Sequence, residues 1–174
     1  MTYDPEKQNR HSVRLKGHDY SQPGAYFVTI CTRDRASLLG EMVDGETRLN
    51  EFGHIVADAW EWLAVQYAHV ELDTSVVMPN HLHGIVVIRD DVRRGVSRNA
   101  PTVGRKPLGR LIGVFKTVST KRVNQLQSTP GAPLWQRDFY EHVIRDEGDL
   151  QGIRGYIQAN PALWDDDENN PRHV

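Results

Sequence analysis

The chain has 174 residues, of which 39% are hydrophobic and 25% are charged, and its formal net charge is −2. These values are typical of one globular domain, here residues 1–174, and no stretch approaches the ~20 apolar residues of a membrane span. The N-terminus lacks the apolar segment of a signal peptide, so we expect a cytoplasmic protein without a membrane partner. The sole cysteine, Cys31, excludes an internal disulfide and disfavours a cysteine-based metal site.

The first predicted elements are a strand, a hairpin and a helix. Residues 24–32, GAYFVTICT, predict a strand because β-branched and aromatic residues dominate. The stretch 38–50 indicates a hairpin or loop that turns at Asp44-Gly45. Apolar residues recur at helical spacing through 51–67, and Asn50 is a suitable N-cap for that helix.

Two strands and a helix follow. Residues 70–79 and 81–88 predict strands with Pro79-Asn80 at their junction. A second helix is predicted over about 107–127, and 132–144 should contain a short strand or extended piece.

The final predicted helix begins after Asp146, which can cap it, and ends at Pro161. We expect residue 160 to leave the α conformation, because the residue before a proline is disfavoured there. The order strand–helix–strand–strand–helix–strand–helix predicts an α+β fold: a ferredoxin-like sandwich whose antiparallel sheet carries helices on one face. The other face of the sheet would then be left for function.

Charge is distributed unevenly along the chain. Residues 89–122 hold ten basic and two acidic residues, a net charge of +8, whereas 138–174 hold nine acidic residues and three arginines, a net charge of −6. A basic linker at 89–107 predicts either a polyanion-binding segment or a solvated loop. About 1–20 and 165–174, which includes DDDENN, are expected to be flexible. The candidate phosphate contacts are Arg93, Arg94, Arg98, Arg105, Lys106 and Arg110, with Lys116 and Arg122 either further contacts or solvated.

Two histidines lie in the predicted strand after MPN. Residues two apart in a strand share a face, so His81 and His83 point together and Leu82 points to the core. The pair could hold one metal ion, although two separately hydrogen-bonded histidines fit the pattern as well. On the last helix Tyr156 and Asn160 are four residues apart and therefore neighbours, which by itself also fits a partly buried tyrosine and a helix-ending asparagine.

Two blocks resemble the REP-associated tyrosine transposases, members of the single-tyrosine HUH transposases. These are VVMPNHLHGIVVI and LWQRDFYEHVIRDEGDLQGIRGYIQANP, and the similarity covers roughly residues 10 to 164. The resemblance implies a ferredoxin-like or RRM-like core in which His81 and His83 bind a divalent metal, Mg²⁺ or Mn²⁺. It further implies that Tyr156 is the nucleophile and that Asn160 completes the metal site. Tyr140 is the rival nucleophile.

The implied activity is cleavage and rejoining of single-stranded DNA, at hairpin-forming repeats, through a 5′-phosphotyrosine. The resemblance also implies a nucleoid-associated enzyme, either monomeric or a homodimer that exchanges its tyrosine helices. Trp135 and Phe139 are candidates for base stacking, with core packing the alternative. Two other functions remain open: a non-catalytic hairpin-DNA-binding protein of the same fold, and a metal-dependent hydrolase that activates water.

Overall fold

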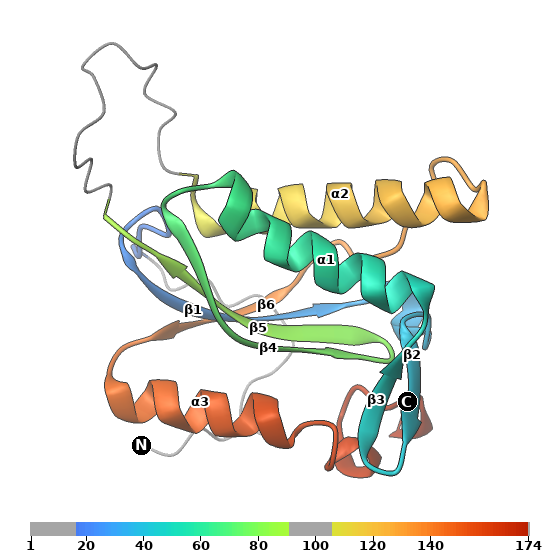
Figure 1. Cartoon of the computed structure of the whole chain (residues 1–174). Helices are drawn as coiled ribbons and strands as arrows, with labels where there is room; N and C mark the ends of the chain where they lie inside the picture. The colour runs from blue at the N-terminus through green and yellow to red at the C-terminus, as the bar shows by residue number, and fades with distance from the viewer. Residues whose placement is uncertain (1–16, 91–105, 174) are drawn as a thin grey trace.

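The structure is a computed structural model that describes residues 17–90 and 106–173. Its centre is a four-stranded antiparallel sheet in the order β4-β5-β1-β6 (Figure 1). The strands of this sheet are β1 (Gly24–Cys31), β4 (Val70–Met78), β5 (His81–Ile88) and β6 (Tyr140–Ile144). A separate hairpin pairs β2 (Gly40–Val43) with β3 (Glu46–Leu49). The helices are α1 (Glu51–Gln66), α2 (Leu108–Gln127) and α3 (Glu147–Ala159), with 3₁₀ turns η2 (Arg33–Arg35), η3 (Trp164–Asp166) and η4 (Pro171–His173).

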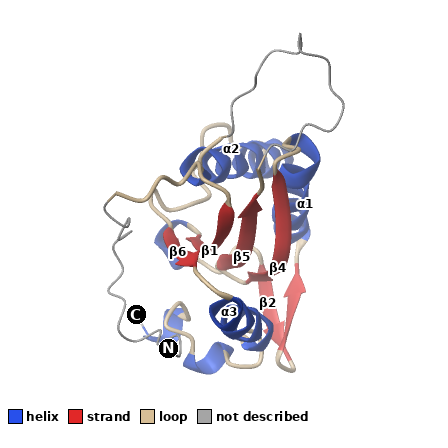
Figure 2. Cartoon of the chain, turned by 90° about the vertical axis from the view of Figure 1, so that its left-hand side faces the viewer, coloured by secondary structure: helices blue, strands red, loops and turns tan. Residues whose placement is uncertain are grey.

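The helices cover both faces of the sheet. Helices α1 and α2 pack on one face, as expected, whereas α3 lies against the opposite face (Figures 1 and 2). The reason is that the central strands are apolar on both sides. On the α3 side, Phe27 and Ile85 are buried and pack with Ile153 and Ile157 of α3. The face that was expected to be open is therefore covered by α3.

Local signals place the turns and helix ends. The Asn50 side chain accepts hydrogen bonds from the backbone N–H groups of Phe52 and Gly53 and so caps α1. Asp44 and Gly45 have φ values of 53° and 77°, the left-handed conformation that the two central residues of a tight hairpin turn need. The sequence-based predictions of these two features are confirmed.

The end of α3 differs from the prediction. Its start is capped as expected, since Asp146 accepts a hydrogen bond from the N–H of Asp149. Asn160, however, keeps α-helical φ and ψ values of −55° and −43° although Pro161 follows it. The prediction that residue 160 leaves this conformation is wrong, because proline disfavours α geometry at the preceding residue without forbidding it. The N–H of Leu163 then bonds to the carbonyls of Ala159 and Asn160, so the chain continues as a tight turn.

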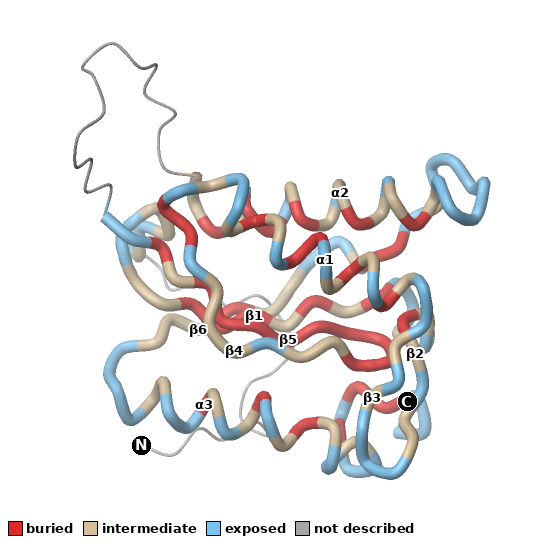
Figure 3. Tube along the Cα trace, viewed as in Figure 1, coloured by how far each residue is buried: buried red, intermediate tan, exposed pale blue. Residues whose placement is uncertain are grey.

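The main core lies between the sheet and helices α1 and α2 (Figure 3). Leu82 is fully buried in this core, which confirms its predicted direction. A Cβ at Gly84 would lie 2.4 Å from the buried Trp60 ring, so glycine is required where α1 crosses β5. Because Leu82 and Gly84 face α1, the side chains that alternate with them on β5 face α3.

Candidate metal and tyrosine site

The two histidines lie at the start of β5, on the face that α3 covers. Both are buried, with 0% and 1% of their surfaces exposed, and their Nε2 atoms are 3.0 Å apart. Strand alternation explains why the rings share this face while Leu82 enters the opposite core. The structure therefore brings His81 and His83 together as predicted, and the two rings face each other through their Nε2 atoms.

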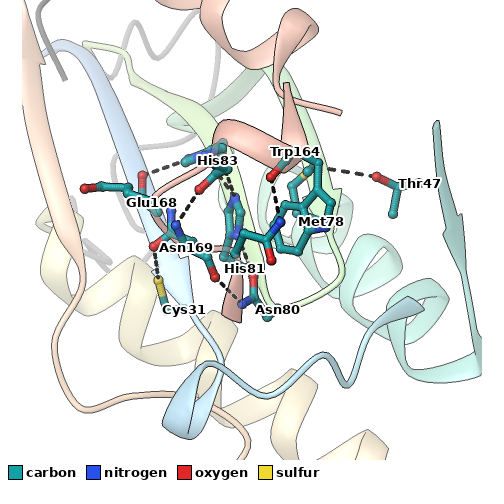
Figure 4. A network of polar contacts seen from close by, with 12 residues as sticks. Cys31, Thr47, Met78, Asn80, His81, His83, Trp164, Glu168 and Asn169 are labelled. Carbon is teal, nitrogen blue, oxygen red and sulfur yellow. Dashed lines mark hydrogen bonds and ion pairs between the residues drawn. The ribbon is translucent and has the colours of Figure 1, made fainter. Parts of the chain in front are cut away.

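Asn80 fixes the tautomer of His81 (Figure 4). Its Nδ2 donates to the backbone carbonyls of Arg35 and Asn169, at 2.9 and 2.7 Å, so its Oδ1 is the atom that faces His81 Nδ1 at 2.8 Å. An amide oxygen can only accept, so His81 carries its proton on Nδ1 and a lone pair on Nε2. On the neighbouring strand the Thr29 hydroxyl lies 2.8 Å from His83 Nδ1 and orients that ring.

Burial keeps both imidazoles neutral. It lowers the pKa of His81 to about 4, an effect that the nearby Asp167 carboxylate only partly opposes. Burial and the adjacent His81 also hold the pKa of His83 well below its ordinary value. At neutral pH the pair is therefore in the uncharged form that metal ions require of histidine ligands.

Asp167, in the C-terminal tail, is a further member of the site. His81, His83 and Asp167 each offer a ligand atom, and these atoms lie within 4.8 Å of one another. Its carboxylate oxygen Oδ2 is 3.9 Å from His81 Nε2, is buried, and has no hydrogen-bond partner within residues 17–90 and 106–173. The other oxygen, Oδ1, accepts a hydrogen bond from the N–H of Asn169 at 2.6 Å.

Sequence reasoning missed Asp167 because its segment has the composition of a flexible tail. In the structure this segment packs over the histidines, with the Trp164 ring stacked on His81 at 6.0 Å between centroids. Asn169 and Asn170 are also buried, and Asn170 Nδ2 donates to the Trp164 carbonyl. The available signals were the half-buried Trp164 and the turn-forming asparagines, but neither has a spacing that identifies a metal ligand.

Helix α3 brings Tyr156 and Asn160 to the same place. The Tyr156 ring lies 5.2 Å from the His83 ring between centroids. Burial raises the pKa of Tyr156, the carboxylates of Asp167 and Glu168 raise it further, and the Asn160 amide lowers it in part. The Asn160 side chain also raises the pKa of His81, so this amide lies close to both the tyrosine and the histidine.

Asn160 has an atom suited to a cation. The residue is 3% exposed, and its Oδ1 is buried without a hydrogen-bond partner in the described part of the chain. A buried amide oxygen ordinarily accepts a hydrogen bond or ligates an ion. Asn160 Oδ1 and Asp167 Oδ2 are thus two oxygens lacking a partner beside two neutral imidazoles, a donor set that fits a divalent cation of mixed N/O preference.

Tyr140 lies on the same face of the sheet as His83, but on β6, at the edge of the sheet. It pairs with Thr29 across β6 and β1, while Thr29 pairs with His83 on the other side. Tyr140 is thus two strands from His83, about 10 Å at the usual strand spacing. Its ring packs on Phe27, 6.1 Å away between centroids. Helix α3 places Tyr156 beside the histidines directly.

The predicted basic contacts do not join this site. Arg93, Arg94, Arg98 and Arg105 lie outside the described residues. Lys106 and Arg110 lie where α2 begins, near the Ile88 end of β5, about 20 Å along the strand from His81. A different arginine is near the histidines: the positive charge of Arg35 lowers the pKa of His81, and its Nη1 donates to the Glu168 carbonyl.

Lys116 has a structural role instead of a solvated one. Its Nζ donates to the carbonyls of Gln136, Arg137 and Asp138 at 2.9, 3.1 and 3.0 Å. Burial lowers the pKa of Lys116 to about 8, although Asp138 acts in the opposite direction. Lys116 therefore fastens the segment before β6 to α2.

No helix within the described ranges is long and apolar enough to cross a bilayer.

Comparisons with known proteins find relatives that match most of the chain. An uncharacterized protein of Haemophilus influenzae is 34% identical over 174 residues, which cover 95% of this chain and 96% of that protein. A second H. influenzae protein, provisionally named REP-associated tyrosine transposase, is 26% identical over 155 residues, 83% of this chain and 73% of its own length. No protein-family model matches the chain.

A solved structure shares the fold. It is a REP-associated tyrosine transposase bound to a REP hairpin, with a TM-score of 0.60 and 19% identity over 91% of this chain and 73% of that one. The named relative and the solved structure both support the resemblance to the REP-associated tyrosine transposases that the sequence shows.

Proposed function

We propose that this protein cleaves and rejoins single-stranded DNA at hairpin-forming repeats, through a 5′-phosphotyrosine formed on Tyr156 with the help of a divalent metal. The observation that carries the proposal is the contact of the Tyr156 ring with His83, 5.2 Å between centroids, at a buried set of ligand atoms. A tyrosine beside neutral imidazoles and a carboxylate is the arrangement that metal-assisted attack on a phosphodiester needs.

The fold supports this function. The sheet order β4-β5-β1-β6, with α1 joining β1 to β4 and α2 joining β5 to β6, has the connectivity of a ferredoxin-like core. The β2–β3 hairpin is an insertion before α1, and α3 is an addition after the last strand. We assign α3 as the helix that carries the nucleophile.

We assign the metal to His81, His83, Asp167 and Asn160. Two imidazoles and two oxygens suit Mn²⁺ or Mg²⁺, with Mn²⁺ more tolerant of nitrogen ligands. A cation bound there would neutralise the charge of a scissile phosphate and favour the phenolate of the tyrosine. The chain alone does the opposite, because burial and the carboxylates of Asp167 and Glu168 raise the pKa of Tyr156.

The protein's own residues would then perform a transesterification. The Tyr156 Oη attacks phosphorus after losing its proton, the bond from phosphorus to the 3′ oxygen breaks, and that oxygen leaves as a 3′-hydroxyl after taking up a proton. The Asn160 amide holds the phenolate, since its hydrogen bond lowers the pKa of Tyr156. A 3′-hydroxyl of another strand can reverse the step, because the phosphotyrosine keeps the energy of the broken ester.

The partner we propose is single-stranded DNA that carries a hairpin. The structural relative with TM-score 0.60 is bound to a REP hairpin, and Arg35 offers a guanidinium beside the metal ligands for a phosphate. The basic linker at 89–107 remains a proposed further contact.

The proposal is tested by trapping a covalent adduct. Wild-type protein with a hairpin-containing single strand and Mn²⁺ should give a protein–DNA band that survives denaturation. Tyr156→Phe should lower its yield at least 100-fold, while the matched variant Tyr140→Phe should still form it, because the Tyr156 ring lies against His83 and the Tyr140 ring packs on Phe27.

Each alternative has its own outcome. An adduct formed by Tyr156→Phe and lost in Tyr140→Phe would move the nucleophile to Tyr140. Strand cleavage without any adduct would favour a hydrolase that activates water. Tight hairpin binding with neither cleavage nor adduct would favour a non-catalytic binding protein.

A further inference from the structure

A groove lies beside α2, on the opposite side of the sheet from the histidines. It has a volume of about 810 Å³ and runs between the C-terminal half of α2 and residues 128–137. Its floor is apolar, formed by Leu134 and Trp135, which are 4% and 7% exposed. Two prolines, Pro130 and Pro133, form part of the outer wall.

The groove has only positive charge. Lys116, Lys121 and Arg137 line it, and no acidic residue does, although the whole chain has a formal net charge of −2. Lys121 and Arg137 are exposed, and neither forms an ion pair with an acid of the described ranges. The remaining lining groups include the amides of Asn124 and Gln125, which can donate and accept hydrogen bonds. Positive rims over an apolar floor match a polymer with charged phosphates and flat bases.

The groove is joined to the metal site by the end of β1. Cys31 pairs with His81, and the next residue, Thr32, forms a bridge with Trp135 of the groove floor. The backbone N–H of Arg33 bonds to the Leu134 carbonyl, so the η2 turn spans the two sites. A strand that leaves the metal site can thus pass Arg35 and enter the groove within a few nucleotides.

We propose that this groove binds the single-stranded segment next to the hairpin, with Lys121 and Arg137 contacting phosphates and bases packing on the apolar floor. The proposal rests on the proposed function for the identity of the nucleic acid. Lys116 is committed to three backbone carbonyls and supports the groove without reaching the strand. An acidic peptide would satisfy the charges, but it would have no reason to lie beside a phosphodiester site.

The test compares two fluorescent hairpins, one blunt and one with a single-stranded extension of about ten nucleotides. Binding to full-length protein is followed by anisotropy over a range of salt concentrations. The double variant Lys121→Gln/Arg137→Gln should bind the extended hairpin about 10-fold more weakly and reduce its salt slope by about 2, because two phosphate contacts are lost. Its affinity for the blunt hairpin should change less than 2-fold.

The control is Arg48→Gln/Arg145→Gln, which removes two exposed positive charges elsewhere. Equal loss for both hairpins in the groove variant, or equal loss in the control, would reduce the effect to general electrostatics and overturn the proposal. Unchanged binding of the extended hairpin by the groove variant would also overturn it. So would a wild-type protein that binds an acidic peptide and does not bind the DNA extension. Adduct formation by wild-type protein is measured separately. If no adduct forms, the binding comparison still tests the groove.

Discussion

At the scale of single residues, Asn80 matters because it decides what His81 can do. Both donors of its amide are used by backbone carbonyls, so its oxygen accepts from His81 Nδ1 and the lone pair of His81 is on Nε2, the atom that faces His83. One of those carbonyls belongs to Asn169 in the tail, and the other to Arg35 in the η2 turn. The tautomer of a buried histidine is thus set by residues far away in the sequence.

Asp167→Asn is expected to weaken Mn²⁺ binding about 10- to 100-fold, because the side chain keeps its shape but loses the charge that faces His81. Isothermal titration with Mn²⁺ measures the effect without reference to DNA cleavage. Asp166→Asn, an exposed neighbour, is the matched control and should bind Mn²⁺ like wild type. Equal affinity of Asp167→Asn and wild type would remove Asp167 from the ligand set.

At the scale of elements, the position of α3 determines whether tyrosine and histidines meet. Its apolar residues Ile153 and Ile157 pack on the sheet, and Arg154 forms a two-bond ion pair with Asp73 of β4, at 2.9 and 2.6 Å. Asp73 lies where the pairing of β4 with β5 shifts between Leu72 and Ser75. An irregular edge strand thus provides the anchor that fixes the helix along the sheet.

Asp73→Asn should lower the free energy of unfolding at pH 7, and should lower it by less near pH 3. The reason is that hydrogen bonding from Arg154 holds the pKa of Asp73 well below its ordinary value. A carboxylate with a lowered folded-state pKa stabilises fully above its unfolded pKa, about 4, and loses that contribution as the pH falls toward the folded pKa.

Urea unfolding of the variant and wild type at both pH values checks this prediction. Asp58→Asn on the exposed face of α1 is the control and should leave the difference between the two pH values unchanged. A variant as stable as wild type at pH 7 would show that the ion pair does not hold α3 in place.

At the scale of the whole molecule, one chain contains a complete candidate site. Residues from β1, β5, α3 and the tail converge there, and Tyr156 meets His83 of its own chain. Exchange of tyrosine helices between two copies is therefore unnecessary for the proposed reaction. The opposite side of the sheet provides the groove along α2, so the proposed cleavage and the proposed binding of the DNA strand lie on different faces.

Mixing Tyr156→Phe with the double variant His81→Ala/His83→Ala should give no more adduct than either protein alone. Each variant lacks one half of a site that a single chain must complete. Denaturing gels of the mixture, compared with wild type diluted into Tyr156→Phe, provide the measurement. Adduct yield well above the separate proteins would show that α3 is exchanged between chains.

The order of the elements, most of their boundaries and the face shared by His81 and His83 can be predicted from the sequence alone. These depend on periodicity, caps and turn residues, which act between neighbours in the chain. The family resemblance supplied Tyr156 and Asn160, and the structure places both near the histidines.

The other features of the site depend on contacts between segments that are distant in the sequence. Asp167 and Arg35 enter the site through backbone contacts between segments more than a hundred residues apart, such as Arg35 with Glu168, for which the chain has no local pattern. Loop 128–137 folds back on α2, so Lys116 donates to a carbonyl of this loop and Lys121 lines the groove between the loop and the helix. Local forces select helices and strands, whereas the donors around a buried cation are selected by which segments meet across the sheet.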